Sequence, residues 1–78
     1  KINSSIIGRN VTIEDGCDIK DSIVMDFTNI GRNTRLNKVI IDRFNIIDKN
    51  TSIGFDTAAD KKRYFVDSSG IVILKRRP

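Results

Sequence analysis

The side chains of this 78-residue chain that are best suited to chemistry are basic, and they gather near its C-terminal end. Residues 1–60 carry eight basic and nine acidic groups, whereas residues 61–78 carry six basic groups and one acidic group. Residues 61–63 and 75–77 hold these six basic groups, and Arg43 follows Asp42 in the middle of the chain. Lysine and arginine donate charge-assisted hydrogen bonds to phosphate, and arginine can donate two in parallel. The pattern indicates either an anion-binding site or a solvated charged surface.

Other kinds of chemistry find little support in the composition. The chain has no histidine to act as a general base, and its five glycines form no Gly-rich loop followed by lysine or arginine. Cys17 is the only cysteine, which excludes an internal disulfide and predicts a packed thiol near a corner. The basic residues are not interleaved with aromatic ones, which favours phosphate on a small molecule over nucleic acid. We expect no membrane partner, because the chain has no apolar run long enough to cross a bilayer and no secretory leader.

The elements that must position these residues follow a repeat of seventeen residues, which runs three times between Ile7 and Thr57. Apolar residues recur at steps of six, six and five. The matched columns are Ile7, Val24 and Ile41; Ile13, Ile30 and Ile47; Ile19, Leu36 and Ile53; and Ile6, Ile23 and Ile40. An amphipathic helix has steps of three and four, and a long strand alternates, so neither gives this pattern. Short strands separated by corners do, which predicts a parallel β-helix.

The corners of the predicted coils are marked by residues that favour an unusual backbone. Gly16, Asn33 and Asn50 occupy equivalent positions in the three copies. Glycine and asparagine enter the left-handed region of backbone space at the lowest cost, so we expect a sharp turn there. Short side chains fill two further columns near the bends: Val11, Thr28 and Asn45; and Cys17, Thr34 and Thr51. Ser5 and Ser22 share another column, but Val39 breaks it, and we base no expectation on it.

The segment after the repeat predicts a short helix and a β-hairpin. Asp56 precedes residues 57–60 as an N-cap would, with an acidic group in the first turn of the helix. Two apolar runs, residues 64–66 and 71–74, then flank a turn that contains Gly70. We expect the hairpin to cover an open side or end of the coils and to deliver the basic cluster to a defined place. The residues expected to provide this cover are Tyr64, Phe65, Ile71 and Ile73.

The coils carry a recognisable sequence pattern. Residues 7–12, repeated at 30–35 and again at Ile53-Gly54, resemble the hexapeptide repeat of left-handed β-helix proteins. Parallel crossovers generally favour the right hand, so the left hand follows from the resemblance alone. The expected fold is all-β: a left-handed parallel β-helix of three coils over residues 1–55, then a short helix and capping hairpin over 56–78. Because the chain starts at Lys1 without a methionine and the repeat begins almost at once, we expect the chain to be a piece of a larger protein.

A more selective resemblance covers essentially the whole chain. Residues 39–43, 47–54, 60–65 and 69–74 resemble, in order and spacing, the C-terminal domain of the ADP-glucose pyrophosphorylases, or glucose-1-phosphate adenylyltransferases. The resemblance implies a nucleotidyltransferase that makes ADP-glucose and pyrophosphate from ATP and glucose 1-phosphate for bacterial glycogen or plant starch synthesis. Its Mg²⁺- and ATP-binding residues would lie in an N-terminal catalytic domain, so this segment alone would have no cofactor and no activity.

The same resemblance implies the role and the residues of the domain. It would pack against its own catalytic domain, help to form a cytoplasmic tetramer and bind a phosphorylated allosteric effector. The positions that match effector-contacting ones are Arg43, next to Asp42, and Arg76, six residues beyond the hairpin glycine. Lys75 and Arg77 are weaker candidates, because alternation along a strand points them away from Arg76.

Two alternatives remain open at this point. A hexapeptide acyltransferase would share the coils, but those enzymes use a histidine, which is absent. A non-catalytic regulatory paralogue or a related sugar-nucleotide transferase domain would also share the coils. The presence of both Arg43 and Arg76 favours the effector-binding domain over that scaffold.

Overall fold

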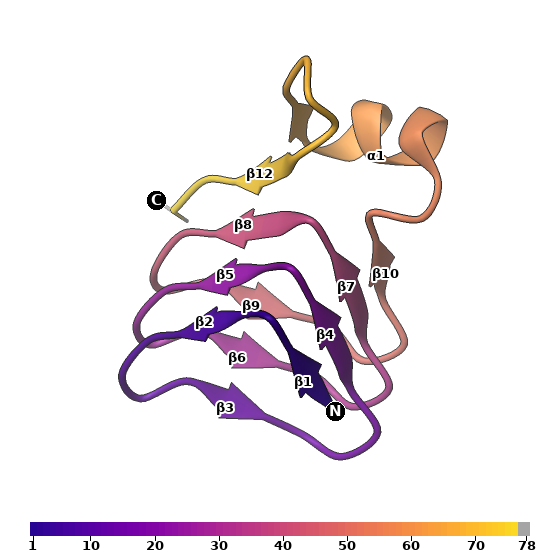
Figure 1. Cartoon of the computed structure of the whole chain (residues 1–78). Coiled ribbons are helices and arrows are strands. Elements are labelled where there is room, and N and C mark those ends of the chain that lie inside the picture. The colour runs from indigo at the N-terminus through magenta and orange to yellow at the C-terminus, as the bar shows by residue number, and fades with distance from the viewer. Residues whose placement is uncertain (77–78) are drawn as a thin grey trace.

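The computed structural model describes residues 1–76 as a stack of short parallel strands that is followed by one helix and a hairpin (Figure 1). The strands of the stack are β1 (Ile2–Asn3), β2 (Ile6–Ile7), β3 (Thr12–Ile13), β4 (Asp18–Lys20), β5 (Ile23–Val24), β6 (Asn29–Ile30), β7 (Arg35–Asn37), β8 (Val39–Ile41), β9 (Ile46–Ile47) and β10 (Ser52–Ile53). Helix α1 (Thr57–Arg63) comes next, and strands β11 (Phe65–Val66) and β12 (Val72–Leu74) form the hairpin.

The strands form three sheets, one on each side of a left-handed β-helix. Their orders are β1-β4-β7-β10, β3-β6-β9 and β11-β12-β8-β5-β2. Neighbouring strands of the coils are parallel and in a register of seventeen residues, as in the pairing of Ile6 with Ile23 and of Ile23 with Ile40. The fold class predicted from the repeat is therefore confirmed. The ladder also starts earlier than the repeat was read, because Ile2 already pairs with Ile19.

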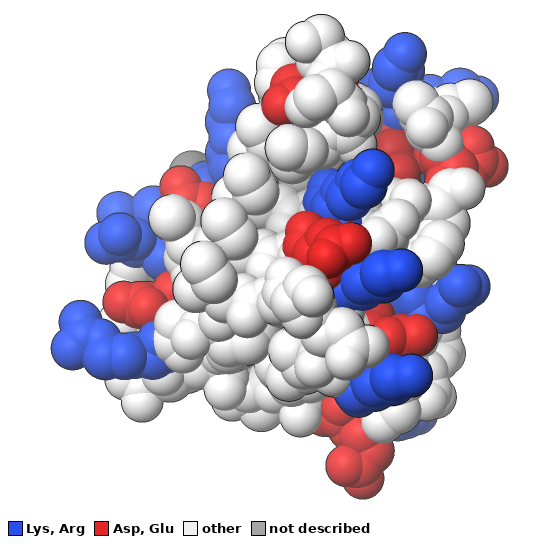
Figure 2. All heavy atoms as spheres, in the orientation of Figure 1, with Lys and Arg blue, Asp and Glu red and all other residues white. Residues whose placement is uncertain are grey.

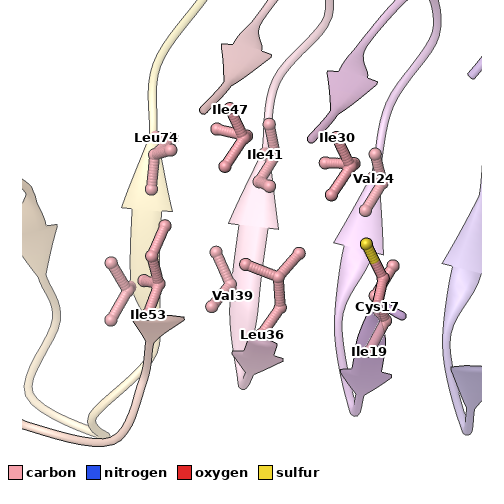
Figure 3. Packing of buried hydrophobic residues seen from close by; sticks show 11 residues of the cluster. Cys17, Ile19, Val24, Ile30, Leu36, Val39, Ile41, Ile47, Ile53 and Leu74 are labelled. Atoms are coloured by element: carbon pink, nitrogen blue, oxygen red, sulfur yellow. The ribbon is translucent and has the colours of Figure 1, made fainter. Parts of the chain in front are cut away.

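The core is a set of apolar columns that run up the inside of the coils. Figure 3 shows these side chains pointing inward from strands on different sides of the stack. Ile19, Leu36 and Ile53 form one fully buried column, and Val24 and Ile41 belong to another. The Cys17 thiol is buried among them and donates to the carbonyl of Gly31 over 3.2 Å, so the predicted packed cysteine is confirmed. Close stacking of like residues explains why the columns are almost entirely aliphatic.

The predicted turns at Gly16, Asn33 and Asn50 are confirmed, with φ of 78°, 58° and 60°. In this conformation the N–H group of Asn33 donates to Asp15 and that of Asn50 to Arg32, each one coil away. Two other corner columns have the same conformation, and the sequence pattern did not identify them. These columns are Ser4, Asp21 and Lys38; and Asn10, Phe27 and Phe44. Each of these three corner columns therefore has its residues in the left-handed backbone conformation.

The serine column also has a structural role. The N–H group of Ser22 donates to Ser5 Oγ over 3.1 Å, and the N–H group of Val39 donates to Ser22 Oγ over 3.2 Å. Ser22 Oγ in turn donates to the carbonyl of Lys20. Each serine hydroxyl thus accepts a hydrogen bond from a backbone N–H group of the next coil. A valine can end the series because Val39 takes part only through its own N–H group.

Helix α1 is anchored to the last coil by a buried carboxylate. The predicted N-cap is confirmed, since Asp56 Oδ1 accepts from the N–H group of Ala59 over 3.2 Å. Asp60, in the first turn, is 5% exposed, and its Oδ2 accepts from the N–H group of Gly54 over 2.9 Å. This bond satisfies a backbone donor at the end of β10, where no further strand of the sheet follows.

The hairpin strands complete the five-stranded sheet, but three of the four residues that were expected to provide its cover do not face the core. Strand β12 pairs in parallel with β8, and Leu74 lies opposite Ile41. Val72 and Leu74 are therefore the residues that face inward, whereas Ile71 and Ile73 are only partly buried and Phe65 is 58% exposed. Tyr64 does pack against the core, as expected. The error arose because alternation alone gives two possible faces, and the register with β8 selects between them.

Candidate functional site

The register of β12 places the two predicted effector residues at the same corner of adjacent coils. Leu74 lies opposite Ile41, so Lys75 follows Asp42 in the stack and Arg76 follows Arg43. Two hydrogen bonds fix this arrangement: the N–H group of Asp42 donates to the carbonyl of Leu74 over 2.9 Å, and Asn45 Nδ2 donates to the carbonyl of Lys75 over 3.0 Å. The structure thus brings Arg43 and Arg76 to one corner from positions 33 residues apart in the sequence.

A stack of aromatic rings supports this corner. The guanidinium carbon of Arg76 lies 4.8 Å from the centre of the Phe44 ring, and Phe44 lies 5.2 Å from Phe27 with the two rings inclined by only 4°. Both phenylalanines are nearly half exposed, at 46% for Phe27 and 44% for Phe44. The sequence reading missed these two residues. Their spacing of seventeen was the available signal, but phenylalanine is not a residue expected at a left-handed corner.

Basic and acidic side chains alternate over the first three coils of this corner. Arg9 lies on the first coil, 3.8 Å from Asp26 on the second, and the backbone N–H group of Arg9 also donates to Asp26 Oδ1. Arg43 on the third coil is close to its neighbour Asp42, with 3.9 Å between Nε and Oδ1. Both side chains of this last pair are about half exposed, so their mutual attraction is screened. Figure 2 shows basic side chains at the left edge of the molecule, above and below an acidic group.

Lys75 belongs to a different surface from Arg76. It lines a cavity of about 630 Å³ at the last coil, together with Lys61, Lys62 and Arg63 of α1. Asp48 is the only acidic residue in the described lining. This cavity gathers the first basic cluster of the sequence, whereas Arg43 and Arg76 are not among its lining residues. The alternation expected between Lys75 and Arg76 thus separates two basic surfaces. Arg77 lies outside the described residues.

The outer face of the five-stranded sheet is apolar, unlike the outer faces of the other two sheets. One residue from each strand forms a column across it: Ile6, Ile23, Ile40, Ile73 and Phe65. Ile6 and Phe65, at the two ends, are 66% and 58% exposed. The four-stranded sheet presents Asp18, Arg35 and Ser52 at its outward positions, and the three-stranded sheet presents Thr12, Asn29 and Ile46, of which only Ile46 is apolar. Figure 2 shows the uncharged band over β2, β5 and β8 between charged margins.

The part of the chain that the structure describes offers neither a metal site nor a membrane-spanning helix. Within residues 1–76, no three or more cysteine or acidic side chains are grouped so that they could hold a metal ion. The described helix is also far too short to span a membrane.

Comparisons with known proteins agree with the fold and with the stated resemblance. The family model described as GlmU-like, C-terminal hexapeptide matches residues 1–74. A glucose-1-phosphate adenylyltransferase of Thermodesulfovibrio yellowstonii is 43% identical over 97% of this chain, and one of Aliivibrio fischeri is 36% identical over 97%. A third, from Anaeromyxobacter, is 37% identical over 91%.

The matches cover the chain almost completely but only a small part of each relative. The chain spans 18% of the length of the Thermodesulfovibrio protein and 17% of that of the Anaeromyxobacter protein. A segment of this size carries the coils but none of the nucleotide-binding features that the resemblance places in a catalytic domain. The three stacked coils, the family match and these relatives agree. The chain therefore belongs to the GlmU-like C-terminal hexapeptide family and is similar to the corresponding part of glucose-1-phosphate adenylyltransferases.

Proposed function

We propose that this chain is the effector-binding and assembly domain of a cytoplasmic bacterial glucose-1-phosphate adenylyltransferase. The parent enzyme would join ATP and glucose 1-phosphate in glycogen synthesis, with Mg²⁺ and ATP bound by a separate catalytic domain. The domain would bind a phosphorylated small molecule at Arg43 and Arg76. Effector binding would shift an existing equilibrium of the enzyme toward one arrangement of its domains.

The observation that carries the proposal is the placement of Arg43 and Arg76 at one corner of consecutive coils. Adjacent strands of a sheet lie about 4.8 Å apart, a spacing at which two guanidinium groups can contact one phosphate group. Asp42 balances only part of this charge, because its pairing with Arg43 is long and exposed. An anion with two negative charges would therefore be favoured at this corner.

The test uses inorganic phosphate as the probe and the full-length enzyme as the sample. Arg43→Ala and Arg76→Ala should each raise the phosphate concentration that gives half of the maximal change in rate by about tenfold or more. Lys62→Ala is the matched control, since Lys62 lines the other basic surface, and it should leave that concentration unchanged. An unaltered phosphate response in both arginine variants would refute the proposal, and a loss confined to Lys62→Ala would assign the anion to the cavity.

The assembly role is supported by the apolar outer face of the five-stranded sheet. A continuous apolar row on an outer face, exposed at its two ends and partly exposed between them, is typical of a protein interface, whereas single exposed apolar side chains need no explanation. Replacing Ile23 and Ile40 with threonine keeps a β-branched residue in each strand while removing apolar surface. Sedimentation of the full-length protein should then show a smaller assembly or separated domains. Ile46→Thr, at an outward position of β9 that is 58% exposed, is the matched control and should leave the assembly intact.

A further inference from the structure

We propose that Phe44 is a positioning residue that holds Arg76 at the anion site. The inference rests on the proposed function, because it assigns to Phe44 a role in binding the ligand of Arg43 and Arg76. The starting observation is that Phe44 supports the guanidinium group of Arg76 on its ring while being almost half exposed itself. Phe44 therefore contributes little to the core, and its place in the structure needs another explanation.

The backbone of Phe44 makes this choice of residue costly. Its φ is 61°, in the left-handed region that bulky side chains rarely adopt. The equivalent position of the first coil holds Asn10, with φ of 54°, which shows that the coil can close this corner with a residue suited to it. The departure from asparagine occurs on the second and third coils, at Phe27 and Phe44, which are the two that lie in line with Arg76.

A guanidinium group that lies over a ring needs no oxygen acceptor from the protein to hold it. The five N–H groups of arginine lie in the guanidinium plane, while a cation–π contact uses only the face of that plane. Arg76 would thus be oriented without losing a donor to a protein acceptor. Arg9 is paired differently, since its side chain lies near Asp26 and that carboxylate also accepts from its backbone. Among residues 1–76, no carboxylate lies within 4.0 Å of the Arg76 guanidinium nitrogens.

Phe27 extends the support by one coil. Its ring is nearly parallel to that of Phe44, which limits the ways in which Phe44 can rotate. The order along the corner is therefore ring, ring and guanidinium group, with Arg43 preceding Phe44 in the chain. Arg43 contacts its own neighbour Asp42 instead of a ring. This asymmetry predicts that changes to the rings affect the contribution of Arg76 and leave that of Arg43.

The test is Phe44→Asn in the full-length enzyme, with inorganic phosphate as the probe. Asparagine is the residue that the corner already accepts at position 10, so the fold should be retained and the melting temperature should not fall by more than a few degrees. Loss of an exposed cation–π contact should raise the half-effective phosphate concentration by about two- to fivefold. Phe44→Tyr keeps the ring and should give the same phosphate response as the wild type. Phe55→Asn, which removes the 4.1 Å contact of the Phe55 ring with Arg35, is the matched control.

The outcomes separate this inference from the function on which it rests. If Arg76→Ala weakens the phosphate response and Phe44→Asn does not, the anion site stands and the role of Phe44 is refuted. Equal loss in Phe44→Asn and Phe55→Asn would also refute it, because the effect would then not belong to this corner. If neither arginine variant changes the response, both the site and the positioning role are overturned. Loss in Phe44→Asn with recovery in Phe44→Tyr supports the inference.

Discussion

Two corners of the same coil follow the same backbone path with very different residues. The polar corner, formed by Gly16, Asn33 and Asn50, uses the residues that adopt positive φ most readily. The aromatic corner continues from Asn10 to Phe27 and Phe44, and phenylalanine is a costly residue in that conformation. The backbone explains the polar corner completely. At the aromatic corner the backbone explains only Asn10, and the contacts of the phenylalanine rings offer an explanation for Phe27 and Phe44.

The largest effect is expected at the polar corner, where the backbone alone selects the residue. Asn33→Val puts a β-branched side chain at φ of 58° and should lower the free energy of unfolding by about 2 kcal/mol. Asn33→Gly should stay close to the wild type, because glycine has no β-carbon to clash. Thermal or urea unfolding measures both. A valine variant as stable as the glycine variant would show that the corner does not select its residue through φ.

A smaller loss is expected at the third corner of the coil, formed by Ser4, Asp21 and Lys38, where hydrogen bonds of the adjacent serine side chains add to those of the backbone. Ser22→Ala removes the acceptor of the buried Val39 N–H group and should cost about 1 kcal/mol or slightly more. Ser5→Ala removes the acceptor of the Ser22 N–H group, and it should cost less because this hydrogen bond is only partly buried. Urea unfolding of the two variants compares them. The serine column would be irrelevant to stability if both matched the wild type.

A near-zero change in stability is expected for Phe27→Asn at the aromatic corner. Asparagine relieves a strained backbone by about 1 kcal/mol, while loss of the stacked ring costs about 0.5–1.5 kcal/mol, so the two nearly cancel. The free energy of unfolding, measured with urea, should therefore stay within about 0.5 kcal/mol of the wild type. A loss as large as that of Asn33→Val would mean that the rings serve the fold itself, and the contrast between the two corners would disappear.

The smallest effect concerns the hairpin turn, where a carboxylate fixes the backbone beside Gly70. Asp67 Oδ1 accepts from the Ser69 hydroxyl over 2.7 Å and from the N–H groups of Ser69 and Ile71. The bond from the Ser69 hydroxyl and that from the Ile71 N–H group hold the pKa of Asp67 below its ordinary value. Its contribution to stability is therefore present above that ordinary value and is lost as the pH falls through the lowered pKa.

Melting temperatures measured in mild and in stronger acid test this contribution of Asp67 to stability. Asp67→Asn should remove the part of the acid-induced decline that Asp67 contributes, so the variant should lose less stability than the wild type over the same pH range. The effect should be slight because Asp67 is only partly buried, so that solvent weakens its hydrogen bonds. Identical pH profiles for the two proteins would show that its hydrogen bonds do not persist in solution.

The sequence predicted those parts of the fold that repeat and missed those that depend on side-chain identity outside the core. The columns of Ile19, Leu36 and Ile53 and the glycine and asparagine turns gave the β-helix, because burial and φ restrict the residues allowed. The inward side of β12 required its register with β8, which strand alternation leaves open. Phe27 and Phe44 were missed because phenylalanine is not expected in the left-handed conformation, although their spacing of seventeen matches the repeat.

The candidate site divides in the same way. Arg43 and Arg76 were named from a resemblance, and their meeting at one corner follows from the pairing of Leu74 with Ile41. The separation of Lys75 from Arg76 was expected from alternation, but the cavity that Lys75 shares with α1 was not. Long-range pairing, which sequence spacing does not encode, accounts for this difference.

The most direct test of the central claim is a crystal structure of the full-length protein grown with inorganic phosphate. The account predicts a phosphate within hydrogen-bond distance of both the Arg43 and Arg76 guanidinium groups, with Arg76 still stacked on Phe44. A phosphate bound instead in the cavity lined by Lys61, Lys62 and Lys75, with none at the corner of Arg43 and Arg76, would contradict it.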